Sequence, residues 1–129
     1  MKEGGKQKVL VAYAAARPRF SKFSREYDHG AGPFTARGWV YRGLTVQAHP
    51  HRKSYTIAHE KSGKTMGLTY ISLADARVAA WRLAEAADWS RDGRTVGQDK
   101  RVAALVHAVR LDLYADLSDH ELKNQETTP

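Results

Sequence analysis

The segment at residues 17–27, RPRFSKFSREY, interleaves cationic and aromatic side chains. Lys and Arg neutralise the phosphates of a nucleic acid, and aromatic rings stack on exposed bases. The pattern therefore predicts a nucleic-acid-binding segment. In the alternative interpretation, the three rings hold a long loop on the core and the cations extend into solvent on their aliphatic stems. The side chains assigned to binding in this segment are Arg17, Arg19, Phe20, Lys22, Phe23 and Arg25.

A second basic cluster, HPHRK, occupies residues 49–53 between two predicted strands. A basic hairpin tip can enter a groove or contact the backbone of a nucleic acid, and a two-stranded β-ribbon fits the major groove. Arg42, with Thr45 and Gln47 on the preceding strand, could read bases if that face of the sheet is open. The alternative is a solvated hairpin end. The residues assigned to binding from this region are Arg42, His49, His51, Arg52 and Lys53.

Histidine spacing raises the question of a metal site. His49 and His51 are two residues apart and share one side of an extended chain, where His29 or His59 could join them as ligands. However, no acidic or cysteine partner stands at a recognisable ligand spacing, and Pro50 predicts a turn rather than a rigid strand. We expect no bound metal.

Catalytic and cofactor motifs are not recognisable. Residues 60–65, EKSGKT, contain the Gly-Lys-Thr of a phosphate-binding loop, but Ala58 stands where its first glycine belongs, so we predict a hairpin turn. Asp28-His29 and Asp119-His120 pair a carboxylate with an imidazole only as sequence neighbours. No nucleophile elbow or dinucleotide fingerprint occurs. We expect a protein without a cofactor that is not an enzyme.

Charge is distributed unevenly along the chain. The net charge is +7, and residues 1–64 hold 13 Lys and Arg against 4 Asp and Glu, whereas residues 65–129 hold 8 against 10. Such asymmetry predicts a polyanionic partner for the first half, with nucleic acid favoured and an acidic protein surface as the alternative.

Length and composition fit a single domain over residues 1–129. The chain has no cysteine, which excludes disulfides and thiolate metal sites and fits a reducing compartment, so we expect a cytoplasmic protein.

The lysines before the apolar run at 9–16 resemble a signal peptide, but Glu3, the glycines and Tyr13 argue against one. No stretch is long and apolar enough for a membrane span.

Proline and glycine residues interrupt regular secondary structure and divide the chain into zones. Residues 1–8 and 124–129 are polar and are expected to fray. The apolar run at 9–16 fits either a strand or a helix, and Pro18 must end it. Residues 17–38 read as a loop with a turn at 28–30. Residues 39–71 then predict three strands, at 39–47, 54–59 and 64–71, joined by two hairpin turns.

After residue 71 the hydrophobic period changes to that of a helix. Ser72 is placed as an N-cap with Asp75 three residues on, and Trp89 falls on the polar side, where it would mark a partner surface. A second helix begins near Gln98, and helices extend to residue 117, with a last turn at 118–121. The positions expected to be buried are Leu73, Ala76, Ala80, Leu83, Ala84 and Ala87 in the first helix and Val102, Leu105, Val106, Val109 and Leu113 in the second.

These zones predict an α+β fold in which a three-stranded antiparallel sheet packs against two C-terminal helices, after a basic N-terminal segment and loop. Residues 39–89, with a helix opening ISLADAR at 71–77, resemble in layout the three-stranded-sheet-plus-helix arm-binding modules of phage-type integrases. The resemblance implies DNA binding and an origin in a phage or mobile element. Our hypothesis is a small DNA-binding accessory or regulatory protein, and the alternative is a protein–protein interaction module or inhibitor.

Overall fold

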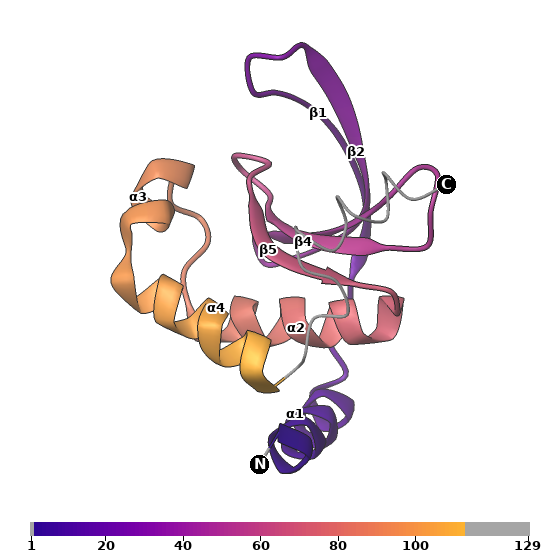
Figure 1. The fold of residues 1–129 in the computed structure, drawn as a ribbon, viewed down its shortest axis with the longest axis vertical. Coiled ribbons are helices and arrows are strands. Elements are labelled where there is room, and N and C mark those ends of the chain that lie inside the picture. The colour runs from indigo at the N-terminus through magenta and orange to yellow at the C-terminus, as the bar shows by residue number, and fades with distance from the viewer. Residues whose placement is uncertain (1, 113–129) are drawn as a thin grey trace, which may run out of the picture.

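The computed structural model describes residues 2–112. In this part of the chain, five consecutive strands follow one helix and precede three more (Figure 1). The elements are α1 Lys2–Ala16, β1 Ser21–Asp28, β2 Pro33–Tyr41, β3 Leu44–Ala48, β4 Tyr55–His59, β5 Thr65–Tyr70, α2 Leu73–Ala86, α3 Gly93–Gln98 and α4 Lys100–Asp112.

The sheet has five antiparallel strands in the order β1-β2-β3-β4-β5. The expected three-stranded sheet with two C-terminal helices is therefore wrong. One error is that the single strand predicted at 39–47 is divided into β2 and β3 by a two-residue turn. Its residues Arg42 and Gly43 both have positive φ, 45° and 86°, as in the turns whose twist suits a hairpin. Arginine is uncommon in this conformation, so the turn carried no sequence signal.

The other error concerns residues 17–38, which were expected to form a loop. They contribute β1 and most of β2, paired from Ser21↔Val40 to Asp28↔Pro33. The turn predicted at 28–30 is confirmed, because the Gly30 N–H donates to Asp28 Oδ1 at 2.8 Å just after β1 ends. In Figure 1 this hairpin projects beyond the rest of the sheet. Most of its side chains contact water on either face, so it lacks the apolar alternation by which strands are recognised.

The N-terminal segment is helical. The predicted fraying of residues 1–8 is wrong for residues 2–8, which belong to α1, and the open choice at 9–16 is settled as a helix. The helix ends where the Arg17 N–H, at φ 48°, donates to the Tyr13 carbonyl at 3.1 Å, directly before Pro18. Tyr13 also places its ring edge-on to Trp81 of α2, with 5.6 Å between centroids. These contacts attach α1 to the body of the protein.

The core lies between α2 and one face of the sheet, and α1 and α4 pack on α2. The predicted start of α2 is confirmed, because the Asp75 N–H donates to Ser72 Oγ at 3.3 Å. Val78, which is not among the residues predicted to be buried, is buried as well. Small side chains on α2 let the helix approach the strands closely. The fully buried residues of this layer are Leu44, Val46, Ile57, Leu68, Tyr70, Ala76, Ala79, Ala80 and Leu83.

Trp89 is the clearest error of the predicted helix. It was expected on an exposed helical face, but its side chain is only 2% exposed. The helix ends at Ala86, so helical phase does not apply to Trp89. The indole N–H donates to the Leu83 carbonyl at 2.8 Å, and the Trp89 carbonyl lies 2.8 Å from Nε2 of the buried His59. Trp89 therefore belongs to the core and not to an exposed partner surface.

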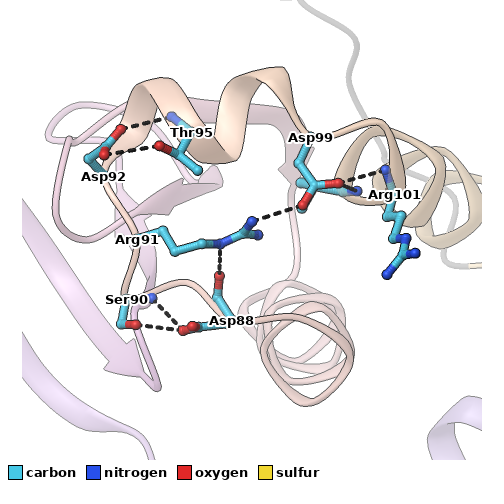
Figure 2. Close-up of polar contacts among 8 residues, drawn as sticks. Asp88, Ser90, Arg91, Asp92, Thr95, Asp99 and Arg101 are labelled. Carbon is cyan, nitrogen blue, oxygen red and sulfur yellow. Dashed lines mark hydrogen bonds and ion pairs between the residues drawn. The ribbon is translucent and has the colours of Figure 1, made fainter.

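Aspartates position the last two helices (Figure 2). Asp92 Oδ1 accepts the Thr95 N–H at 2.8 Å at the start of α3, and Asp99 Oδ1 accepts the Arg101 N–H at 2.8 Å at the start of α4. The side chain of Arg91 joins the two regions, with Nη1 2.9 Å from Asp99 Oδ2 and Nε 3.1 Å from the Asp88 carbonyl. The aspartates therefore have a structural role.

The C-terminal helix prediction is correct in part. The helix predicted from Gln98 begins at Lys100, after the additional short α3. Val102 and Val109 are buried as expected, and Leu105 and Val106 pack partly against the core. Leu113, the rest of the predicted helix to residue 117, the last turn at 118–121 and the frayed end at 124–129 lie outside the described residues. Across residues 2–112, no helix combines the length and apolarity that crossing a bilayer requires.

Candidate nucleic-acid interface

Cross-strand register places cations beside an aromatic ring on the β1–β2 hairpin. Lys22 pairs with Trp39, and Ser24 pairs with Arg37. Because alternate residues of a strand share a face, all four side chains lie on one face of the hairpin. Lys22 and Arg37 are exposed, whereas Trp39 is partly buried. This face therefore presents two exposed cations beside a partly buried indole.

The indole is held by groups that the sequence places far apart. The Arg77 guanidinium carbon of α2 lies 5.1 Å from the Trp39 ring centroid and 5.7 Å from that of Phe20. Phe20 in turn stacks on Tyr41, with 5.1 Å between centroids. Arg77 Nε is buried and has no hydrogen-bond partner within the described part of the chain. The cation is thus retained by aromatic faces, an arrangement that stabilises a partly desolvated guanidinium.

An open hollow of about 470 Å³ lies on the hairpin beside this ring. The cations Lys22 and Arg37, the Ser24 hydroxyl and the Trp39 indole share one face, whereas Phe23, which pairs with Gly38, points to the opposite face. Among the residues that the structure describes, no carboxylate lines the hollow. Its lining residues are Lys22, Phe23, Ser24, Arg37, Gly38 and Trp39. This combination can neutralise a phosphate and contact the face of a planar ring at the same time.

The β3–β4 loop extends the basic surface. Tyr55, the first residue of β4, lies 6.3 Å from Trp39 between ring centroids, so the loop ends beside the hairpin face. Within the loop, the His51 N–H donates to His49 Nδ1 at 3.0 Å. Both histidines and Lys53 are exposed, and Arg52 is partly exposed. We call Lys22, Arg37, Trp39, His49, His51, Arg52 and Lys53 the hairpin surface.

A larger cleft, of about 880 Å³, brings together two other predicted residues in a different electrostatic setting. Arg25 and Arg42 line it with Lys61, but Glu60, Glu85 and Asp88 line it too. Arg42 Nη1 lies 3.2 Å from Glu85 Oε1, and Arg25 Nη1 donates to the Glu60 carbonyl at 3.3 Å. The cations of this cleft are balanced by carboxylates, so it attracts polyanions less than the hairpin surface does.

Two tyrosines beside this cleft are kept protonated. Burial, and next the hydrogen bond to Glu85, raise the pKa of Tyr41, whose hydroxyl donates to Glu85 Oε1 at 2.6 Å. Burial also raises the pKa of Tyr27, whose hydroxyl donates to the Glu60 carbonyl. Both hydroxyls therefore act as donors that hold strands and helix together.

The remaining predicted residues fall outside the hollow. Arg17 and Arg19 are exposed in the link between α1 and β1, and the half-buried Phe20 packs inward as the alternative interpretation held. Thr45 was a candidate for reading bases, but it is fully buried and its hydroxyl donates to the Ala58 carbonyl at 3.3 Å. Gln47 Nε2 donates to that hydroxyl at 3.1 Å. Base reading by these residues required an open face, which the buried Thr45 does not have.

Sequence reasoning missed Arg37, Trp39 and Arg77 as members of the site. A strand starting at Pro33 would have placed Arg37 and Trp39 on one face, but that start was not recognised. Arg77 carried no usable signal, because its aromatic partners lie on β2 and before β1. Within residues 2–112, no group of three or more His, Asp or Glu side chains is placed to hold a metal ion.

Comparison of the chain with protein-family models, with curated proteins and with solved structures finds no match. The layout resemblance to integrase arm-binding modules stays a prediction. The case for function therefore depends on the geometry of the hairpin surface.

Proposed function

We propose that this protein binds nucleic acid through the hairpin surface, as a small accessory or regulatory protein. The observation that carries the proposal is the hollow beside Lys22, Arg37 and Trp39, in which two cations meet an aromatic ring without a carboxylate among the described residues. Phosphate contacts supply most of the affinity in such a complex, and ring contacts with bases add to it.

Four of the cations are charged at any physiological pH, namely Lys22, Arg37, Arg52 and Lys53. If each neutralises one phosphate, the logarithm of the affinity falls with the logarithm of salt concentration with a slope of about −3 to −4. Arg17 and Arg19 extend the same charge toward α1.

The experiment measures fluorescence anisotropy of labelled 20-mers, duplex and single-stranded, from 25 to 300 mM salt. In Lys22→Glu/Arg37→Glu we expect the Kd to rise at least tenfold and the salt slope to shrink by about 2. The matched control is Arg94→Glu/Lys100→Glu, which makes the same charge change at exposed positions of α3 and α4. The control should keep the affinity within about threefold.

Two outcomes overturn the proposal. Absence of binding to either 20-mer at 25 mM salt removes nucleic acid as the ligand and leaves an acidic protein surface as the partner class. An equal loss in both double variants shows attraction by net charge alone and removes the hairpin surface as the site.

A further inference from the structure

We infer that the hairpin surface selects single-stranded nucleic acid and places an unpaired base against Trp39, in the hollow beside Lys22 and Arg37. The inference rests on the proposed function and specifies its ligand. Aromatic side chains contact the face of a base, and in a duplex that face is covered by the neighbouring base pairs. A hollow that presents the Trp39 ring beside two cations therefore suits a nucleic-acid strand whose bases are free.

The ring of Trp39 is fixed before any ligand arrives. Arg77 lies over it at 5.1 Å, Tyr55 lies 6.3 Å away, and Lys22 is its cross-strand partner. Side chains held in this way lose little rotamer entropy on binding, which favours affinity. A volume of about 470 Å³ also lies within the range of about 300–1,000 Å³ that is typical of small-molecule pockets in proteins.

The spacing of the cations beside the hollow suits a single strand of nucleic acid. Lys22 pairs with Trp39, and Arg37 lies two residues before Trp39, so the two cations are diagonal neighbours about 7–8 Å apart at their Cβ atoms. This spacing lets them hold neighbouring phosphates of one extended strand. The side chains considered for reading a duplex groove, Thr45 and Gln47, are instead hydrogen-bonded within the sheet. The structure thus gives no support to base recognition in a duplex groove, and it supports the stacking of an unpaired base on the hairpin surface.

The first test changes the ligand and leaves the protein intact. Affinity is measured by anisotropy for dT20, for a 20-mer duplex and for a dT20 in which five central nucleotides are abasic. We expect dT20 to bind at least tenfold tighter than the duplex, and the abasic strand, which keeps all its phosphates, to bind at least fivefold more weakly than dT20.

The second test compares Trp39→Leu with Phe23→Leu. Both change an aromatic residue of the same hairpin to leucine, but Phe23 pairs with Gly38 and points to the face opposite Trp39. Trp39→Leu should weaken dT20 binding at least fivefold and change duplex binding less than twofold. Phe23→Leu should leave both unchanged.

The inference is overturned if the duplex binds as tightly as dT20, if the abasic strand binds as tightly as dT20, or if the two leucine variants behave alike. In each of these cases the proposed function stands as long as Lys22→Glu/Arg37→Glu still weakens salt-dependent binding. If neither dT20 nor the duplex binds, the proposed function and the inference fall together.

Discussion

A Cβ atom added to Gly38 would lie 1.9 Å from the carbonyl oxygen of Val46. Gly38 pairs with Phe23 on one side and with Gln47 on the other, at the point where the β1–β2 hairpin leaves the rest of the sheet. Only a residue without a side chain lets β2 approach the backbone of β3 this closely. The contact therefore fixes how the hairpin surface is attached.

Gly38→Ala should lower the free energy of unfolding by about 2 kcal/mol or more, because the methyl group must displace the backbone of β3. The measurement is the midpoint of urea unfolding. Gly97→Ala is the control, since a Cβ at Gly97 meets no atom within 4 Å and the residue lies in α3. That change should be neutral or stabilise by up to about 1 kcal/mol. Equal losses in the two variants would show that the close approach is not what matters.

His59→Ala should lower the free energy of unfolding by about 2–4 kcal/mol. His59 Nε2 donates to the Trp89 carbonyl, its Nδ1 is hydrogen-bonded to Ser62 Oγ, each at 2.8 Å, and its side chain is buried. Removing it leaves a buried carbonyl without a donor and opens a cavity. His107→Ala, at an exposed position of α4, should change stability by less than about 0.5 kcal/mol. A His59→Ala protein as stable as His107→Ala would show that these bonds contribute nothing.

Tyr27→Phe should loosen the far end of the hairpin without unfolding the protein. The Tyr27 hydroxyl donates to the Glu60 carbonyl, and its ring covers Gly63 in the β4–β5 turn. Loss of one such bond costs about 1 kcal/mol, which corresponds to roughly fivefold faster exchange of the hairpin amides. Hydrogen exchange read residue by residue provides the measurement, with the amides of α2 as the internal control. Faster exchange of all amides, those of α2 included, would show that the Tyr27 hydroxyl does not stabilise the hairpin specifically.

Asp99 should make stability depend on pH in the acid range. Its hydrogen bond from Arg91, and next the bond from the Arg101 N–H, hold the pKa of this carboxyl below its ordinary value of 3.8. The folded state therefore binds this proton less readily than the unfolded state. The stabilisation is fully present above the unfolded pKa and is lost as pH falls through the folded pKa. Thermal midpoints from pH 7 to pH 2 should fall less steeply for Asp99→Asn, and parallel curves for the two proteins would contradict this.

Features encoded by adjacent residues were predictable from the sequence. The Ser72 cap, the hairpin turns after β3 and β4 and the turn at Asp28 each depend on residues within a few positions of one another. The β1–β2 hairpin was not predictable in this way, because its outer half contacts water on both faces. The Arg42-Gly43 turn was hidden because arginine rarely adopts a positive φ.

The same distinction applies to the candidate site. Lys22 and Phe23 were identified because they belong to a local run of cations and rings. Arg37 was missed because the start of β2 was missed, and Arg77 because its partners Phe20 and Trp39 reach it only through the packing of α2 on the sheet. Side-chain neighbours that arise from tertiary packing leave no periodic trace in a single sequence.

The order of the sheet has a consequence for how the chain reaches its native state. Every strand pairs with the one that follows or precedes it in sequence, so each pairing closes a connection of only a few residues. Short closures cost little chain entropy, and proteins dominated by such near-neighbour pairings fold faster than those that join distant segments. We therefore expect the sheet to assemble hairpin by hairpin, with docking of α1 onto α2 and α4 as the slower, long-range event.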